Sequence, residues 1–214
     1  MKKLLYVILL LYIMTSCSIE KVEAKKSLAE SIILIDPGHG GKDNGASYGE
    51  LIEDELNLEI SFLISDYLID GGATVYFTRT GDYDLSSKSA SNKKKDDLKE
   101  RLRIIHNYKP DLFISIHMNT YPSMNVNGAQ VFYYKENLLA NCIQKELNVL
   151  NNKEKKIKKD DIYLLKNSLI PCCLIECGFV TGNIDYQNFQ NKEYKKEVAI
   201  KICEGIENYL LINQ

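Results

Sequence analysis

Apolar and polar positions along the chain form two patterns, short apolar runs and longer stretches with helical spacing. Residues 32–35 are all apolar, and the run stops at the Asp-Pro-Gly of residues 36–38, as a buried strand does where it feeds a loop. From Ile52 to Tyr67, apolar residues recur at spacings of 4, 4, 3 and 4, which predicts one buried face of a helix that ends at residues 71–72. A strand followed by a helix therefore opens the folded part of the chain.

The rest of the chain repeats this alternation of strand and helix patterns. Polar stretches at 81–95 and 151–161 interrupt it. Either could be a plain solvated loop, although the first could also close over a ligand and the lysines of the second could attract acidic groups. Because no internal repeat or second domain is evident, we expect a single α/β domain over residues 31–214. The predicted strands are 73–79, 111–117, 128–134, 162–165 and 172–175, and the predicted helices are 96–108, 138–150 and 194–211.

The same patterns indicate which side chains face the core. Along strand 111–117 alternate side chains face opposite sides of the sheet, so His117 at its end shares a face with Ser115. In helix 96–108 the apolar residues repeat at helical spacing, and Arg101 is expected on the outward side with its charged neighbours.

Composition adds little to this picture beyond size and charge. The 214 residues are 45% hydrophobic, which fits one ordinary domain with a short extra segment. The net charge of −2 gives no indication of nucleic-acid binding.

The N-terminal segment has the pattern of an export signal. Lys2 and Lys3 precede an apolar run over residues 4–14, which is shorter than the about 20 residues that a membrane span needs. Small residues then lead to Cys17, as in a lipoprotein cleavage site, so Cys17 is a candidate for lipidation. We therefore expect a signal peptide or membrane anchor over 1–17, a polar tether over 18–30, and a protein exported to the outer face of the membrane or the cell wall.

Six cysteines in an exported chain raise the question of disulfides. No CxxC pair or framework spacing is present, and adjacent Cys172 and Cys173 would point to opposite faces of a strand. We expect the cysteines of the folded domain to act as small apolar fillers, with a zinc–thiolate site or a disulfide as the alternatives.

Four polar residues are predicted at one edge of the sheet. His39 follows the first strand, His117 ends the third, and Glu176 ends the last long strand, at the carboxyl ends where open α/β sheets bind ligands. Glu53 opens the first helix, which runs back antiparallel to its strand, so Glu53 lies at the same end as His39, whereas Asp54 turns away.

Each of these residues also has an ordinary structural explanation. The glycines around His39 lack the spacing of a phosphate cradle, and this segment could be a turn whose histidine faces solvent or caps a helix. Glu53 could be a solvated residue that interacts with the helix dipole, and His117 a hydrogen-bonded core histidine. Glu176 is harder to explain in this way, because a carboxylate that ends a buried strand is costly unless it is paired or used.

Taken together, the four residues fit a catalytic zinc centre. Two histidines and one carboxylate leave an open position on zinc, which is the pattern of catalytic rather than structural sites. A remaining carboxylate can serve as the general base and then return the proton to a departing nitrogen. A site of this kind hydrolyses amides.

The segments around these residues resemble a known family. DPGHGGKDNGA, the helix start with Glu53 and Asn57-Leu58, SIHMN and IECGF match in order the four motifs of zinc-dependent N-acetylmuramoyl-L-alanine amidases. The resemblance implies a three-layer domain whose mostly parallel central sheet, of about six strands, is flanked by helices, as in phosphorylase/hydrolase-like folds. It also implies that His39, Glu53 and His117 hold zinc, that Glu176 is the catalytic glutamate, and that the substrate is peptidoglycan.

Within that family the chain looks most like the spore-cortex amidases of the CwlD type. The lysine-rich insert before DDLKERLRIIHN and the segment NGAQVFYY carry this likeness. It implies a step toward the muramic-δ-lactam needed for germination, and an activator or targeting protein as partner. Asn119, in the SIHMN segment, is a candidate substrate-binding residue. The rival hypotheses are another zinc peptidase and a non-catalytic wall-binding or scaffold protein.

Overall fold

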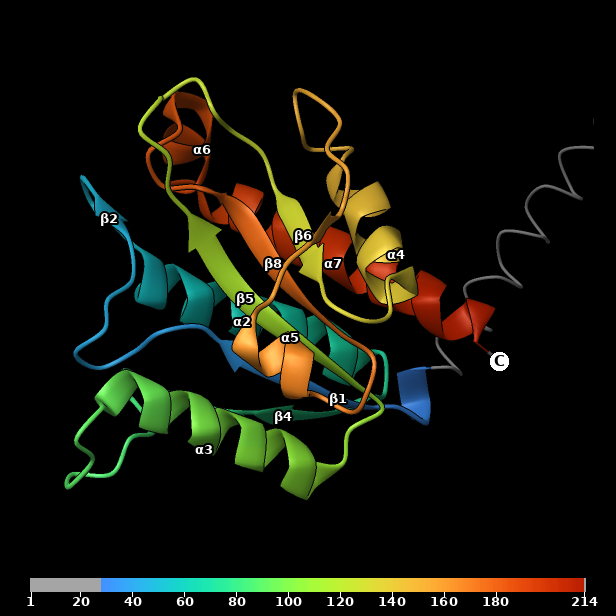
Figure 1. Ribbon diagram of the computed structural model, residues 1–214. Coiled ribbons are helices and arrows are strands. Elements are labelled where there is room, and N and C mark those ends of the chain that lie inside the picture. The colour runs from blue at the N-terminus through green and yellow to red at the C-terminus, as the bar shows by residue number, and fades with distance from the viewer. Residues whose placement is uncertain (1–27, 214) are drawn as a thin grey trace, which may run out of the picture.

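The computed structural model describes residues 28–213, which form a six-stranded sheet with helices on both faces (Figure 1). The strand order is β4-β1-β5-β8-β6-β7. Strands β4, β1, β5 and β8 are parallel, β6 is antiparallel to β8, and β7 is parallel to β6. The mostly parallel sheet expected from the sequence is thus confirmed. The strands are β1 (Ile32–Pro37), β4 (Thr74–Phe77), β5 (Leu112–Asn119), β6 (Gln130–Tyr133), β7 (Lys158–Lys159) and β8 (Cys172–Phe179), and a separate hairpin pairs β2 (Ser47–Tyr48) with β3 (Leu51–Ile52).

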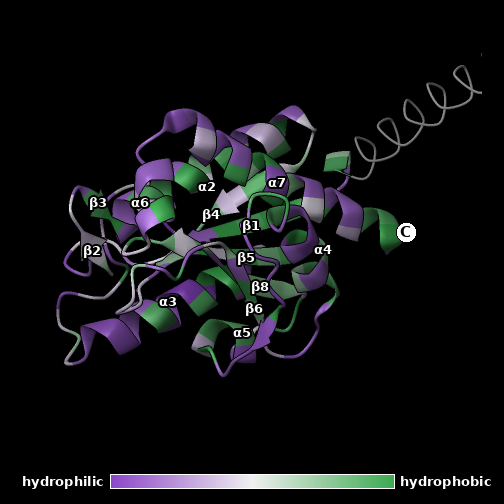
Figure 2. Cartoon of the chain, turned by 90° about the horizontal axis from the view of Figure 1, so that it is seen from above, coloured by the Kyte–Doolittle hydropathy of each residue, from purple (hydrophilic) through white to green (hydrophobic). Residues whose placement is uncertain are grey.

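The helices divide between the two faces of the sheet, which gives three layers. One hydrophobic cluster joins α2, α4 and α7 to one face, and a smaller cluster joins α3 and α5 to the other. Figure 2, seen from above, shows α2 and α7 on one side of the strands and α3 and α5 on the other. The helices are α2 (Glu53–Asp70), α3 (Lys93–Tyr108), α4 (Leu138–Leu147), α5 (Tyr163–Asn167), α6 (Asn183–Asn188) and α7 (Lys192–Ile212).

The cysteines of the domain are part of this core. Cys173 is buried in the larger cluster and Cys172 in the smaller one, as expected for neighbours on a strand. All five cysteines within residues 28–213 are free and buried. The prediction that they are apolar fillers is confirmed for this part of the chain, whereas Cys17 lies outside the described residues.

One predicted element type and the predicted ends of two strands near the site are wrong. Residues 163–167 form the short helix α5 rather than a strand, because Leu164 and Leu165 pack side by side on the smaller cluster, and a run of four apolar residues does not distinguish the two. Strand β8 continues through Cys177 to Phe179, so Glu176 lies within the strand and not at its end. Strand β5 likewise continues to Asn119, so His117 also lies within its strand.

Two charged side chains predicted to turn outward are buried instead. Arg101 is 2% exposed because it forms an ion pair with the buried Asp36 at the end of β1. Asp54 is 3% exposed at the start of α2. Helical spacing alone places both outside. Arg101 has its partner Asp36 on β1, whereas Asp54 Oδ1 is buried without a hydrogen-bond partner. Helix α3 also begins at Lys93, three residues before the predicted start at Asp96.

The N-terminal expectations fall mostly outside the described residues. The signal or anchor over 1–17 and most of the tether over 18–30 lie there, while Leu28, at the end of that tether, is buried in the larger cluster. None of the helices within residues 28–213 has the length and apolar character that crossing a membrane requires.

Candidate metal centre

Three of the four residues predicted at the sheet edge converge on one point. His39 follows β1, His117 lies in β5, and Glu53 is the first residue of α2. One ligand atom from each lies within 4.8 Å of the others, and this is the only group of its kind in the described part of the chain. Glu53 Oε1 lies 3.1 Å from His39 Nε2 and 3.0 Å from His117 Nδ1. The predicted grouping of these three residues is therefore present.

The fold brings them together through the pairing of β1 with β5. The two strands are parallel neighbours, with Pro37 in register with Ile116, so the residues that follow Pro37 meet His117. The Gly38 amide extends this pairing by donating to the Ile116 carbonyl at 2.9 Å. Helix α2 then starts at the same edge, where the Glu53 amide donates to the Ala46 carbonyl at 2.9 Å.

Two glycines leave room for the three side chains. A Cβ on Gly38 would lie 2.3 Å from the imidazole of His117, and a Cβ on Gly45 would lie 2.4 Å from Glu53 Oε2. Gly45 has a φ of +66°, and His39 itself has a φ of 61°, which is rare for a residue with a side chain. Strained backbone conformations of this kind are typical of functional sites.

Glu53 is surrounded by donors. Besides the two imidazoles, its Oε1 accepts from the Met118 amide at 3.1 Å, and its Oε2 accepts from the Ala46 amide at 2.7 Å. Burial favours its neutral form, but the hydrogen bonds from His117 and His39 hold the pKa of Glu53 well below its usual range. Glu53 is therefore ionised at neutral pH, as a metal ligand must be.

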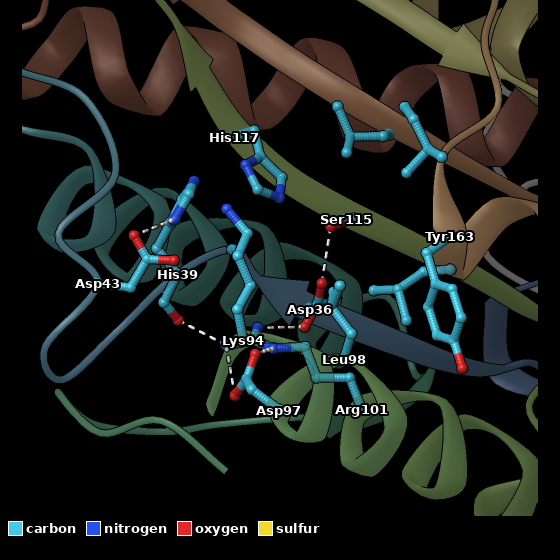
Figure 3. A pocket seen from close by; sticks show the side chains of 14 residues that line it. Asp36, His39, Asp43, Lys94, Asp97, Leu98, Arg101, Ser115, His117 and Tyr163 are labelled. Atoms are coloured by element: carbon cyan, nitrogen blue, oxygen red, sulfur yellow. Dashed lines mark hydrogen bonds and ion pairs between the residues drawn. The ribbon is translucent and has the colours of Figure 1, made fainter. Parts of the chain in front are cut away.

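His39 is oriented by a second carboxylate. Its Nδ1 lies 3.1 Å from Asp43 Oδ1, and Figure 3 shows Asp43 facing the ring from the loop. Burial disfavours the charged imidazole, but Glu53 and Asp43 outweigh burial and raise the pKa of His39. A carboxylate on the second ring nitrogen is the usual outer partner of a metal-binding histidine. Asp43 is a site residue that was not predicted, although its spacing of four from His39 is visible in the sequence.

Glu176 stands beside the three residues but makes different contacts. It is in register with His117 across the β5–β8 pair, so both side chains face the same side of the sheet. Its Oε2 is buried and has no hydrogen-bond partner. Burial raises the pKa of Glu176 to about 7, and the Glu53 carboxylate adds to this effect, while His117 opposes it.

Two buried arginines, which the sequence analysis missed, hold the loop that carries His39. Arg101 donates to the carbonyls of Pro37 and His39, and Arg79 donates to the carbonyls of Pro37 and Gly38. The carbonyl oxygens at the end of β1, and in the residues that follow it, thereby receive hydrogen bonds from buried side chains. Burial of guanidinium groups is decided by distant partners, so no local pattern in the sequence reveals it.

A pocket of about 190 Å³ opens beside the histidines, on the face of the sheet covered by α3 and α5 (Figure 3). Asn119, proposed from the sequence as a substrate contact, is not among its lining residues, and its side chain accepts from the Thr120 amide at 2.8 Å. The lining residues are Asp36, Gly38, His39, Asp43, Lys94, Asp97, Leu98, Arg101, Ser115, His117, Ile162, Tyr163, Leu164 and Leu174.

The donor set fits a cation. Two imidazole nitrogens and one ionised carboxylate face each other, and the buried oxygen of Glu176 beside them has no partner. Nitrogen and carboxylate donors in this combination suit zinc and related divalent ions. The fold and the site together define an α/β protein with a His-Glu-His group of metal-binding type at the carboxyl ends of its parallel strands.

Comparison with known proteins identifies the family. Residues 33–208 match the family model of N-acetylmuramoyl-L-alanine amidases, and the chain belongs to this family. It is therefore an enzyme that hydrolyses the amide between N-acetylmuramic acid and L-alanine in peptidoglycan, as the motifs had indicated.

Individual relatives agree with this assignment. The germination-specific N-acetylmuramoyl-L-alanine amidase of Bacillus subtilis is 39% identical over 191 residues, which cover 85% of this chain and 81% of the relative. The CwlD amidase of Clostridioides difficile, solved in complex with the GerS lipoprotein, is 34% identical with a TM-score of 0.81, over 86% of this chain and all of the solved one. An amidase of Nostoc punctiforme is 31% identical with a TM-score of 0.75, over 85% and 97% of the two chains.

Proposed function

We propose that the enzyme is a zinc amidase in which His39, Glu53 and His117 hold the metal and Glu176 is the catalytic base. The main support for this proposal is that three ligand atoms lie within 4.8 Å of one another, next to a buried carboxylate oxygen that has no partner. When bound, the zinc ion would supply Lewis-acid polarisation of the scissile carbonyl and of the attacking water.

Glu176 would carry the proton through the reaction. Its ionised carboxylate accepts a proton from water as the oxygen forms its bond to the carbonyl carbon. The same carboxyl group then donates that proton to the alanine nitrogen as the carbon–nitrogen bond breaks. A pKa of about 7 suits both steps, because the group exchanges its proton readily near neutral pH. Asn119, two residues beyond His117 in β5, is retained as a proposed substrate contact.

We propose spore-cortex peptidoglycan as the substrate and a role in forming muramic-δ-lactam for germination. Two relatives support this, the germination-specific amidase of Bacillus subtilis and the CwlD amidase of Clostridioides difficile. Mass spectrometry of cortex from spores that lack this protein tests the proposal, because muramic-δ-lactam should be absent. Normal lactam content would assign the enzyme to the vegetative wall instead.

A protein partner and a membrane tether belong to the same proposal. The Clostridioides difficile relative was solved with a lipoprotein, which supports an activating or targeting partner for this chain. Its N-terminal segment, with the apolar run 4–14 and Cys17, supports export and attachment at the outer face of the membrane. Labelling with a palmitate analogue, compared between wild type and Cys17→Ala, tests whether Cys17 carries the lipid.

The activity itself is tested with purified protein, zinc and peptidoglycan. Free amino termini on L-alanine should appear, should be lost when zinc is chelated, and should return when zinc is added back. A protein that releases no such termini with excess zinc and cell extract would instead be a wall-binding scaffold. Glu53→Ala separates the two, because it removes a zinc ligand and should abolish hydrolysis without abolishing scaffold-type binding to the wall.

A further inference from the structure

Lys94 is a charged residue of the pocket that the proposed mechanism does not use. It lines the same cavity as His39 and His117. In Figure 3 its side chain extends from α3, and its ammonium group points toward the two histidines. The cavity beside the two histidines therefore has a cation in its lining.

The other charges of this pocket are already balanced. Arg101 pairs with Asp36 and Asp97, each at 2.7 Å, and Asp43 faces His39. Lys94 forms no ion pair with any carboxylate among residues 28–213, although its charge helps to lower the pKa of Asp43. An exposed ammonium group at the rim thus has free donors for a ligand.

The position of Lys94 is not explained by helix stability. It lies in the first turn of α3, where the partial positive charge of a helix N-terminus disfavours a lysine. Lys93 and Lys95 share this first turn, so what sets Lys94 apart is that it alone of the three lines the pocket. The helix end also adds to the positive potential that an anion would meet at this rim.

One wall of the pocket is apolar. Leu98 of α3, Leu174 of β8 and Leu164 of α5 line it, and Tyr163 lies at its far side (Figure 3). A pocket that combines this apolar wall with one cation free of an ion pair, beside the two histidines, fits a short peptide with a small side chain and a carboxylate. It fits a sugar less well, because sugar hydroxyl and acetamide groups are neutral.

The substrate has such a peptide next to the bond that is cut. In peptidoglycan the alanine is followed by a glutamate whose α-carboxyl group is either free or amidated. At about 3.5 Å per residue of extended chain, that group lies roughly 7 Å from the scissile nitrogen. This is the length scale of a lysine side chain reaching across a pocket rim.

We propose that Lys94 binds the free α-carboxylate of the second stem-peptide residue and so makes the enzyme prefer peptidoglycan that is not amidated there. The proposal rests on the proposed amidase function and adds a specificity-determining residue to it. Lys94 acts on binding, at a distance from the bond that breaks.

The test compares two ligands that differ only in this group, N-acetylmuramoyl-L-alanyl-D-glutamate and its D-isoglutamine amide. Their affinities are measured by calorimetry on zinc-loaded Glu176→Gln protein, so that no turnover is needed. We expect the free acid to bind roughly five- to tenfold more tightly than the amide, as for a charge-assisted contact at a partly exposed site. In the double variant that combines Glu176→Gln with Lys94→Ala, this preference should disappear. In the double variant with Lys94→Arg, it should remain.

Lys95→Ala is the matched control. Lys95 has the same charge in the same helical turn but does not line the pocket, so its loss should leave the preference unchanged. An equal loss with Lys95→Ala, a preference that persists in Lys94→Ala, or no binding of the free acid at millimolar concentration would each overturn the proposal. Thermal midpoints of all variants confirm that they are folded.

Kinetics on the active enzyme separate this proposal from a failure of the amidase function. Lys94→Ala should raise KM for the free acid by a similar factor, with kcat nearly unchanged, and leave the amide substrate unaffected. A fall in kcat on both substrates would place Lys94 at the reacting bond and overturn the specificity role. Absence of cleavage by the enzyme with Lys94 intact would contradict the proposed function, whereas the binding measurement stands independently of turnover.

Discussion

The two carboxylates of the centre lie in contrasting surroundings. On the β1–α2 side, Glu53 accepts from two imidazoles and two backbone amides, and the adjoining loop is held by buried arginines. On the β8 side, the buried Oε2 of Glu176 accepts from no group of the described chain. Many polar contacts therefore fix the carboxylate of Glu53, whereas the buried oxygen of Glu176 has no hydrogen-bond partner.

This difference shifts the pKa values of the two carboxylates in opposite directions. Donors around Glu53 lower its pKa and keep it charged, whereas burial raises the pKa of Glu176 to about 7. Two titratable groups whose environments push their pKa values apart are a mark of divided acid–base roles. These surroundings support the proposed roles, in which the β1–α2 side binds a cation and Glu176 on the β8 side exchanges a proton.

The largest expected effect comes from Glu176→Gln. The amide keeps the size of the side chain but cannot accept the proton, so hydrolysis should fall by roughly a thousandfold or more. Bound zinc should remain, because the ligands lie on the other side. Released alanine amino termini and metal content by atomic spectroscopy measure the two quantities. The exposed Glu193→Gln serves as control, and loss of zinc in Glu176→Gln would contradict the division of roles.

Arg101→Met should damage the β1–α2 side through stability. It leaves Asp36 buried without its ion pair and removes donors from the Pro37 and His39 carbonyls. We expect a loss of about 3–5 kcal/mol in the free energy of unfolding, as for a broken buried pair. Arg103→Met on the same helix is the control, since its pair with Glu100 is largely exposed and should contribute less than about 1 kcal/mol. Urea unfolding measures both, and equal losses would be the contrary result.

The β8 side should make the metal-free protein sensitive to pH. The folded pKa of Glu176, about 7, is above its usual 4.5, so its neutral form is favoured in the folded state. Its contribution to stability is therefore complete below about pH 4.5 and is lost as the pH rises through 7. Relative to Glu176→Gln, wild type should lose about 3 kcal/mol across this window. Urea unfolding at several pH values measures the difference, and a constant difference would mean that Glu176 is not desolvated.

Asp43→Asn should give the smallest effect. The amide keeps the shape but loses the charge that orients His39, so zinc affinity should fall by about 10- to 100-fold. Competition with a chromophoric chelator measures the affinity. Asp66→Asn, an exposed acid on α2, should leave it unchanged. An unaltered affinity in Asp43→Asn would show that the loop and its arginines position His39 without help.

The sequence determined most of the fold and the main residues of the site. Apolar runs and helical spacing gave the α/β alternation because burial repeats with the period of each element, and they placed His39, Glu53 and His117 at one edge because parallel strands share their carboxyl ends. The strand predicted at 162–165 is wrong, because four apolar residues fit either a strand or a helix. Packing of Leu164 and Leu165 on the smaller cluster favours the helix.

Tertiary structure alone decided the charged interior. Arg101 and Asp54 have the spacing of surface residues, yet both are buried. Arg101 is buried because the distant Asp36 and backbone carbonyls receive its charge, whereas Asp54 Oδ1 is buried without a hydrogen-bond partner. The same holds for the contrast between Glu53 and Glu176, since each pKa depends on neighbours that come from other strands and loops. A local pattern can place a carboxylate at an edge, but only the folded chain sets whether donors keep that carboxylate ionised or burial leaves it without a partner.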